Sequence, residues 1–281
     1  RLSEAPKVPD HRHRLFPRTL APLPRGEAVV SLSTSGFMVL PADYEAGPNA
    51  PRVRTAVNSA DFSTAVAPGG LISIFGDNLS SVTASASQTP LPTLLGDTCI
   101  TINDQLAPLL FVSPNQINAQ LPFEVEGTAS LVLHGPAAAS SPFEFQTQTV
   151  APALFNTAVE GWPQDFPVVY RRANNQIVTL SNPIHPDDWL DIYCTGLGPV
   201  SPAVATGAAG LADPLSVALW RPVVTLGGTT VPVLFAGLEP GSPGVYRISI
   251  KAPLRGRTGM EVPLTITQGG FSTSITVRVV D

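Results

Sequence analysis

The chain has 281 residues, 43% of them hydrophobic and only 13% charged, and it contains 30 prolines and 23 glycines. Typical domains carry about 25% charged residues and about 12% glycine plus proline, so charge is scarce here and turn formers are abundant. This composition excludes a mostly disordered chain, which is charge-rich, and a long-helix protein, because proline breaks helices. No apolar run approaches the ~20 residues that span a bilayer. We therefore predict an all-β protein without a membrane span.

The net charge of −5 is unevenly distributed along the chain. Residues 1–25 carry a net charge of +4, so the rest of the chain carries −9. A basic segment can bind nucleic acid, but this one holds no aromatic residue besides Phe16 and no recognisable reading motif. We therefore expect no nucleic-acid partner. Attraction between the basic end of one copy and the acidic body of another, or simple solvation, explains the same charges.

Residues 1–56 are predicted to form an extended arm, a β-hairpin and a linker. Five prolines fall within residues 1–26, which favours a largely polyproline conformation. Apolar residues then alternate with polar ones around a Ser/Thr/Gly turn, as in a hairpin. A lone two-stranded hairpin is marginally stable in water, so this one is expected to add to another sheet. The residues expected to make that inter-subunit contact are Val30, Leu32, Phe37 and Val39.

The remaining chain repeats itself once. Three segments of the first half recur in the second, each as short strands separated by turn residues. The matched pairs are residues 66–79 and 184–197, 99–112 and 223–236, and 116–135 and 246–270. The middle pair contains a tight turn, at Asn103-Asp104 in the first copy and at Gly227-Gly228 in the second. Short strands with turns about every 10 residues are typical of a β-sandwich of about 100 residues.

We therefore predict two tandem immunoglobulin-like β-sandwiches, at residues 57–155 and 156–281. The second range includes a further hairpin at residues 166–183, turned at Ala173-Asn174-Asn175. This hairpin either caps the junction between the sandwiches or supplies the first strand of the second one.

The repeated strings also carry a family resemblance. VAPGGLISIFGDNL, from Val66, and DIYCTGLGPVSPAVATGAAG, from Asp191, resemble the uncharacterised C-terminal tandem domain (Solibacter type) of large extracellular proteins of Acidobacteria. Each half is also similar to the IPT/TIG class of immunoglobulin-like domains. The resemblance implies a secreted, non-catalytic appendage that often follows β-propeller blades, and residues 15–41 look like the end of such a blade. It supplies no catalytic residues.

Residues that carry enzyme or metal chemistry are scattered. Serine is frequent, but there is no GxSxG elbow, and His134 and His185 have no carboxylate at triad spacing. A calcium loop needs about six or more oxygens in one compact string, and no DxDxDG-like string occurs. We expect no enzyme activity, no metal site and no cofactor.

Aromatic residues of the second half offer an alternative function, a sugar-binding platform. The five candidates are Trp162, Tyr170, Trp189, Tyr193 and Trp220. Trp162 and Trp220 fall in loops, a position compatible with exposure at the surface. By contrast, Phe75, Phe111 and Phe235 occupy matched strand positions and are predicted to be core residues.

Cys99 and Cys194 are a disulfide candidate, because an even pair of cysteines in a secreted β-protein is usually bonded. Strand alternation complicates this pairing. If Ile100 and Ile102 point into the core, Cys99 points outward, whereas Cys194 points inward with its own apolar neighbours. A bridge between the sandwiches, two free thiols and a link between copies all remain open.

Strand edges point to assembly between copies. Soluble monomers guard edge strands with Lys, Pro or bulges, yet this chain has only two lysines, Lys7 and Lys251. An unpartnered hairpin and weakly guarded edges favour β-strand addition. The leading hypothesis is an extracellular structural protein, the subunit of a cell-surface filament or layer assembled head to tail. The alternatives are a passive stalk after a β-propeller and a glycan-binding or adhesive module.

The first residue bears on the compartment. The chain begins at Arg1, with no initiator Met and no signal-peptide-like apolar stretch, which predicts a mature secreted product or a fragment of a longer precursor.

Overall fold

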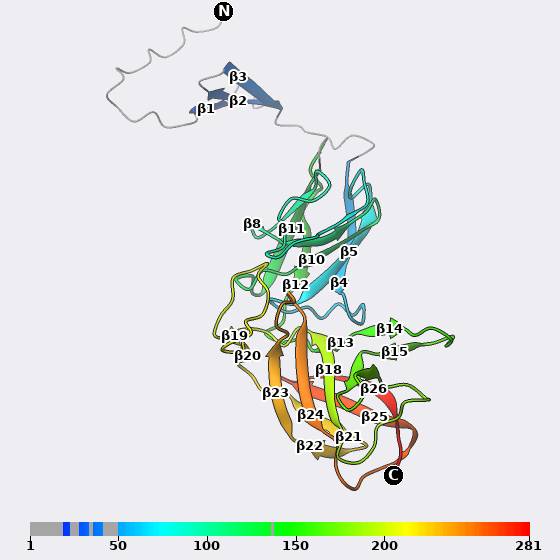
Figure 1. Ribbon diagram of the computed structural model, residues 1–281. Coiled ribbons are helices and arrows are strands. Elements are labelled where there is room, and N and C mark those ends of the chain that lie inside the picture. The colour runs from blue at the N-terminus through cyan, green and yellow to red at the C-terminus, as the bar shows by residue number, and fades with distance from the viewer. Residues whose placement is uncertain (1–18, 23–27, 34–35, 42–49, 136–137) are drawn as a thin grey trace, which may run out of the picture. The chain divides into compact units, whose positions relative to one another are not determined.

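The computed structural model describes residues 19–22, 28–33, 36–41, 50–135 and 138–281. These residues form strands, turns and loops, and the described ranges hold no helix (Figure 1). The chain divides into two compact units, Arg1–Gly47 and Pro48–Asp281. The fold class is therefore all-β, as predicted.

The first unit contains a small antiparallel sheet of three strands, in the order β1-β2-β3. Its strands are β1 (Thr19–Pro22), β2 (Ala28–Ser33) and β3 (Gly36–Pro41). The predicted hairpin is confirmed, because β2 pairs with β3 along its whole length. The predicted arm is wrong at Thr19–Pro22, which pairs with β2 as a third strand. The rest of the predicted arm lies outside the described residues.

The first sandwich of the second unit packs a sheet of five strands against a sheet of four. The larger sheet runs β4 (Arg52–Asn58), β5 (Leu71–Asp77), β10 (Gln116–Gln120), β9 (Leu109–Val112) and β6 (Ala84–Ser85). The smaller runs β12 (Phe143–Gln146), β11 (Thr128–His134), β7 (Cys99–Ile102) and β8 (Gln105–Leu106). Alternate aliphatic residues such as Ile72, Ile74, Ile100 and Leu131 fill the core between the sheets.

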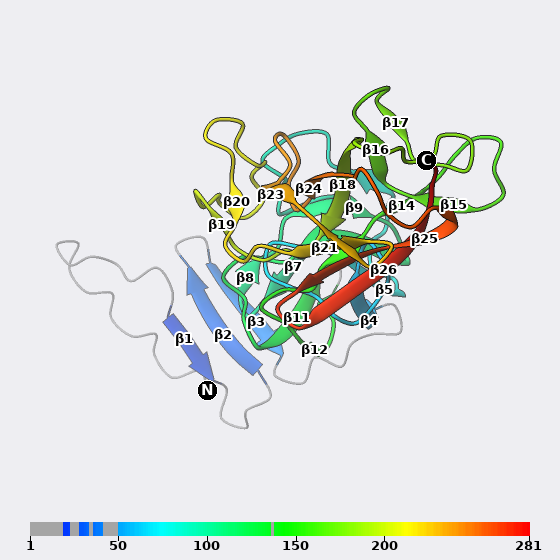
Figure 2. The same ribbon diagram turned by 90° about the horizontal axis from the view of Figure 1, so that it is seen from below.

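The second sandwich has the same design with additional strands. Its larger sheet runs β17 (Gln176–Ile177), β16 (Val169–Arg171), β18 (Trp189–Thr195), β24 (Tyr246–Lys251), β23 (Val233–Leu238), β20 (Val217–Ala218) and β19 (Val200–Ser201), and β13 (Ala153–Leu154) also pairs with β18. Its smaller sheet runs β22 (Thr229–Val231), β21 (Val223–Leu226), β25 (Gly259–Gln268) and β26 (Phe271–Val279). A separate hairpin joins β14 (Asn156–Ala158) to β15 (Asp165–Pro167). Figure 2 shows β25 and β26 side by side at the red end of the chain.

The internal repeat is confirmed by strand order. The ladder β4-β5-β10-β9-β6 of the first sandwich corresponds to β16-β18-β24-β23-β20 of the second, and β12-β11-β7-β8 corresponds to β26-β25-β21-β22. The tight turns also match, because Asn103 and Asp104 have φ of 49° and 62°, and Gly227 and Gly228 have 60° and 85°. Two successive residues with positive φ make the turn that suits the twist of a hairpin.

The strand pairing places the sandwich boundaries a few residues from the predicted ones. Arg52 already pairs with Asp77, so the first sandwich begins before residue 57. Ala153 pairs with Thr195, so the chain joins the second sandwich before residue 155. The hairpin at residues 166–183 belongs to the second sandwich, since β16 pairs with β18, but β13 precedes it as the first strand.

The two sandwiches meet across a hydrogen-bonded junction. The Leu71 N–H donates to Thr195 Oγ1 at 2.9 Å, and the Thr195 hydroxyl donates to the Gly244 carbonyl at 2.8 Å. The Gly207 N–H donates to the side-chain oxygen of Gln120 at 2.7 Å. Thr195 and Gln120 are both fully buried, so each sandwich supplies a polar side chain that the other satisfies.

Candidate functional site

The four predicted inter-subunit residues lie on two neighbouring strands of the first unit. The register pairs Val30 with Val39 and Leu32 with Phe37. Cross-strand partners share one face of a sheet, so the four positions belong to the same face. In the described residues, β1, β2 and β3 pair only with one another. Their contact with a second copy stays a prediction.

The two cysteines are not bonded to each other. Cys99 is a half-buried free thiol on β7 of the first sandwich, and Cys194 is a buried free thiol on β18 of the second. The predicted alternation is confirmed, since Ile100 and Ile102 are fully buried and Cys99 is not. Burial raises the pKa of both thiols. Neither therefore has the lowered pKa of a reactive cysteine.

Three of the five candidate aromatics gather on one surface, the outer face of the larger sheet of the second sandwich. Trp189 and Tyr193 alternate along β18, and Tyr170 on β16 lies opposite Asp191 between them. The Tyr170 and Tyr193 rings are 5.8 Å apart and nearly perpendicular. Trp162 instead lies edge-on to Phe166 at 5.5 Å, and Trp220 is 44% exposed in a loop.

The prediction that Phe75, Phe111 and Phe235 are core residues is wrong. All three are half-buried and lie outside the two hydrophobic cores. Phe75 follows Ile74, whose side chain is fully buried, so strand alternation turns the phenylalanine to the outer face. The aromatic matches between the repeats therefore mark the outer faces of the sheets.

The aromatic surface of the second sandwich is held together by charges centred on Asp191. Arg172 donates two hydrogen bonds to its carboxylate, at 2.6 and 2.7 Å, and the Ser249 hydroxyl donates a third at 2.5 Å. The Arg247 guanidinium lies 3.8 Å from the same carboxylate and 2.8 Å from Glu239. We call this set of residues the Asp191 network.

Both arginines of the Asp191 network also lie over aromatic rings. The Arg172 guanidinium is 5.4 Å from the Trp189 ring centre, and that of Arg247 is 5.1 Å from the Phe235 ring centre. Cation–π contacts of this length are attractive. Asp191, Arg172 and Ser249 therefore satisfy one another on this face, whereas Glu239 Oε2 and Arg247 Nε are in ion-pair contact without a hydrogen bond of good geometry.

The pKa shifts in the network follow from these contacts. Burial raises the pKa of Asp191, but hydrogen bonds from Arg172 and Ser249 and the charges of both arginines outweigh it, so the pKa lies below its usual value. Glu239 behaves oppositely, because burial and the nearby Asp191 charge raise its pKa more than Arg247 lowers it.

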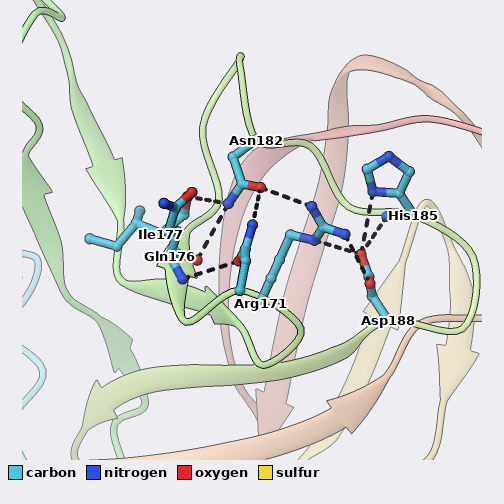
Figure 3. A network of polar contacts seen from close by, with 7 residues as sticks. Arg171, Gln176, Ile177, Asn182, His185 and Asp188 are labelled. Carbon is cyan, nitrogen blue, oxygen red and sulfur yellow. Dashed lines mark hydrogen bonds and ion pairs between the residues drawn. The ribbon is translucent and has the colours of Figure 1, made fainter.

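A second polar network bonds the loop that leads into β18 to strands β16 and β17 (Figure 3). Arg171 donates to the Asp188 carboxylate at 2.7 and 3.1 Å and to the Asn182 side chain at 2.8 Å. Asp188 also accepts a hydrogen bond from the backbone N–H of His185 at 2.7 Å. The side-chain amide of Asn182 donates to the backbone carbonyl of Ile177 at 2.9 Å. These bonds join Arg171 of β16 and Ile177 of β17 to Asn182 and Asp188 of the loop, so the network fixes the entry to β18.

A groove of about 390 Å³ lies where the two sandwiches meet. Trp220 and Pro199 line it from the second sandwich, and Glu126 lines it from the first. The connecting segment contributes Gln148 and Thr149. Of the candidate aromatics, the groove includes Trp220, while Tyr170, Trp189 and Tyr193 lie on the outer face described above.

The described residues bring no catalytic constellation together. His134 contacts the Thr101 hydroxyl at 3.1 Å, and His185 lies 3.6 Å from the Asp188 carboxylate. No described hydroxyl or thiol hydrogen-bonds to the His185 ring, and no cluster of three or more His, Cys, Asp or Glu in the described ranges is arranged to hold a metal. Nor do these ranges contain a helix long and apolar enough to cross a membrane.

The sequence identified Trp220 as a surface aromatic but not the groove around it. Glu126, Gln148 and Thr149 lie in turn and linker segments that carry no motif. They come together only because β13 joins the second sandwich immediately after the first one ends. The sequence pattern that could have indicated the groove is a tryptophan in a loop, Trp220, together with the short polar linker that contains Gln148 and Thr149.

No family model matches the chain. No curated protein matches it either. Among solved structures, it is similar to the surface glycan-binding protein SGBP-B of the mixed-linkage glucan utilization locus of Bacteroides ovatus, in complex with a mixed-linkage heptasaccharide, with 13% identity and a TM-score of 0.35. That match covers 90% of this chain and 52% of the other, so the chain spans about half the length of that protein.

Two further similar structures are built of tandem domains. Domains 5–6 of the S-layer protein SbsC match with 10% identity and a TM-score of 0.25, over 82% of this chain and 99% of the other. The I9-I11 tandem of titin matches with 7% identity and a TM-score of 0.21, over 94% of this chain and 82% of the other. At these identities the likeness concerns the fold alone.

Proposed function

We propose that this chain is a non-catalytic structural protein of the cell exterior, whose copies join head to tail by β-strand addition. In this arrangement β3 of one copy pairs with the free edge of β26 in the next. The observation that carries the proposal is the edge of β26, where the outward backbone groups from Ser272 to Thr276 have no partner among the described residues.

Strand β26 lies at the end of its sheet and pairs with β25 on one side. The two strands are joined through Gly269 and Gly270, and Gln268 pairs with Phe271 across that turn. In a hairpin with a two-residue turn, the flanking pair is hydrogen-bonded and the next residues alternate, so every second residue of β26 directs its backbone groups outward. These outward residues are Ser272, Ser274, Thr276 and Arg278.

One hydrogen bond identifies the residues of β26 whose backbone groups point away from β25. The Ile184 N–H donates to the Arg278 carbonyl at 2.9 Å, from the side opposite β25. Ile184 thus covers the last part of the edge, while the described residues include no partner for the outward backbone groups of Ser272, Ser274 and Thr276. The strand holds no Lys and no Pro, the residues that guard edges against pairing.

The donor is the sheet of the first unit. Strand β3 has six residues, about 20 Å of extended chain, and it is an outer strand of its sheet. Phe37 and Val39 are two positions apart in β3, which is the spacing at which residues of an added strand lie on one face. The +4 charge of residues 1–25 and the −9 charge of the remaining chain favour encounter of unlike ends.

The family resemblance supports the extracellular setting of this proposal. The acidobacterial tandem domain that the repeats resemble is an appendage of extracellular proteins. A second candidate function is a passive stalk that follows a β-propeller. It is favoured by the sheet of β1, β2 and β3, because three antiparallel strands account for most of a four-stranded propeller blade.

Truncation tests the proposal. The full chain and residues 48–281, which form a compact unit of their own, are compared by size-exclusion chromatography with light scattering and by electron microscopy. We expect oligomers or filaments from the full chain and monomers from the truncated one. A full chain that stays monomeric at high concentration refutes strand addition and supports the stalk.

A matched pair of point variants tests the acceptor edge. Ser274→Pro removes an outward N–H that the chain itself does not use, while Ser274→Ala keeps that N–H and removes only the hydroxyl. We expect Ser274→Pro to block assembly and Ser274→Ala to preserve it, with circular dichroism confirming that both fold. Should Ser274→Pro unfold the sandwich, Ser272→Lys with Ser274→Lys guards the same edge without altering the backbone. Assembly unaffected by the lysine pair excludes β26 as the acceptor.

A further inference from the structure

We infer that the groove between the two sandwiches binds a neutral carbohydrate, with a sugar ring stacked on Trp220. This inference is independent of assembly through β26. It rests on three features of the groove: an exposed aromatic ring, unused polar side chains and the absence of basic residues from its lining.

The aromatic surface is Trp220, which remains 44% exposed. Its carbonyl accepts a hydrogen bond from the buried Gln268 side chain at 2.6 Å. Its ring lies beside Gly198, since a Cβ built on that glycine would be at an ordinary van der Waals distance, 3.5 Å, from the ring. Pro68 and Pro199 also line the groove. The Gln268 bond thus fixes the backbone that carries the indole, which lowers part of the entropy cost of ordering the ring against a ligand.

The polar side chains of the groove are available to a ligand. Glu126 and Thr149 are exposed and Gln148 is half-buried, and none of the three side chains hydrogen-bonds to another described residue. Thr147 is different, since its hydroxyl already donates to the Gly127 carbonyl at 3.1 Å. A carboxylate, an amide and a hydroxyl therefore offer both donors and acceptors next to an apolar ring.

The Asp191 network shows the opposite arrangement. It carries more aromatic rings than the groove, but its Asp191 carboxylate is already hydrogen-bonded to Arg172 and Ser249 and ion-paired with Arg247. A ligand there would have to displace ionic hydrogen bonds, whereas a ligand in the groove displaces water. The groove is the more favourable site.

The lining selects the class of ligand. A volume of about 390 Å³ falls in the range of small-molecule sites, about 300–1,000 Å³. Glu126 is the ionisable residue of the lining, so the groove repels uronates, sulfates and phosphates. A ring that is apolar on its face and carries hydroxyls at its rim meets both the indole and the polar side chains. A short segment of a neutral polysaccharide fits these conditions.

Tryptophan fluorescence tests the inference directly. The chain has three tryptophans, and Trp162→Phe with Trp189→Phe leaves Trp220 as the sole reporter. We would titrate this variant, as the full chain, with cellohexaose, laminarihexaose, maltohexaose, xylohexaose and mannohexaose at up to millimolar concentration, with tri-galacturonate as the anionic probe. We expect saturable quenching by at least one neutral hexasaccharide and none by the galacturonate.

Calorimetry on otherwise native chains locates the site. Trp220→Ala is expected to weaken binding about tenfold or more, as truncation of an aromatic anchor does. The matched control is Trp162→Ala, because that ring packs on Phe166 and does not line the groove. Glu126→Gln removes the carboxylate charge from the lining, so this variant is expected to bind galacturonate more tightly than the parent chain does.

Three outcomes overturn the inference. The first is no saturable signal from any of the five hexasaccharides. The second is binding that Trp220→Ala leaves unchanged, and the third is binding that Trp189→Ala abolishes while Trp220→Ala does not, which would place the ligand on the outer face. Repeating the titration with residues 48–281 separates this result from assembly, because the groove lies wholly within that unit.

Discussion

The two sandwiches share strand order and register, but the side chains on the outer faces of their larger sheets differ in kind. On the outer face of the first, the Ser73 hydroxyl donates to the Asn118 side chain at 3.0 Å, and Gln116 donates to the same oxygen at 2.8 Å. The register places Asp191 and Ser249 of the second sandwich where the first has Ser73 and Asn118. One repeat therefore covers its sheet with neutral hydrogen bonds and the other with an ionic network.

The added hairpin of the second sandwich explains the difference. Arg172 follows β16 directly and reaches Asp191, the carboxylate at the centre of the face. In the first sandwich β4 occupies the corresponding edge, and there Val57 lies opposite Ser73. A buried carboxylate is stable only with a partner, so the aspartate and the arginine depend on each other. In each sandwich, whether the outer face carries an ionic or a neutral network therefore depends on whether the neighbouring edge strand brings an arginine to the centre of the face.

The largest expected loss in the free energy of unfolding comes from the hydrophobic core positions that the two sandwiches share. Ile74 and Ile192 occupy matched, fully buried core positions. Truncating either to alanine is expected to cost about 2–5 kcal/mol, because the loss of buried methyl groups leaves a cavity. Urea unfolding of Ile74→Ala and Ile192→Ala, compared with the parent chain, measures both. A cost below ~1 kcal/mol at one site alone would mean that the two cores are not equivalent.

The second prediction separates the outer faces. Asp191→Ala leaves Arg172 and Arg247 without their shared partner, and it is expected to cost about 2–3 kcal/mol, less than a fully buried pair because Arg172 is partly exposed. Ser73→Ala removes a neutral hydrogen bond and is expected to cost about 1 kcal/mol. Urea unfolding measures both variants.

The control for that comparison is the ion pair of the first sandwich. Arg54 and Asp77 are 2.7 Å apart, but their side chains are 65% and 39% exposed. Asp77→Ala is therefore expected to cost less than ~1 kcal/mol. If Asp191→Ala costs no more than Asp77→Ala, the Asp191 network contributes nothing beyond an ordinary surface pair.

Periodicity and turn chemistry were sufficient to predict most of the fold. The repeat, the hairpin turn at Asn103-Asp104 and the inward alternation around Cys99 all depend on local sequence, and all three are confirmed. The strand Thr19–Pro22 was missed because three prolines in residues 17–24 favour extended chain, and an extended chain can also pair as a strand.

The site was less accessible to sequence reasoning. Trp220 was identified as a surface aromatic, but the groove depends on how residues 147–149 pass from one sandwich to the other. Phe75 was placed in the core because aromatic residues at matched positions suggest packing, whereas here the inner positions belong to aliphatic residues. Which face an aromatic residue covers is decided by register, and one residue of register reverses it.

The smallest expected effect concerns pH. The pKa of Asp191 is lowered in the folded chain, so this carboxylate stabilises the fold above its unfolded pKa of about 4 and loses that contribution as the pH falls through the folded value. The pKa of Glu239 is raised, so its contribution is full below its unfolded pKa of about 4.3 and declines as the pH rises toward the folded value. The two groups therefore act in adjacent windows with opposite signs.

Unfolding free energies measured by urea between pH 3 and pH 6 resolve these windows. Asp191→Asn is expected to flatten the rise of stability with pH below about pH 4, and Glu239→Gln to remove the decline of stability with pH that Glu239 contributes just above. Ser73→Ala serves as the reference, since the matched position of the first sandwich carries no titratable group. A profile that Asp191→Asn leaves as steep as the parent's would show that the acid sensitivity arises elsewhere, and that at this position the ionic and neutral faces respond to pH alike.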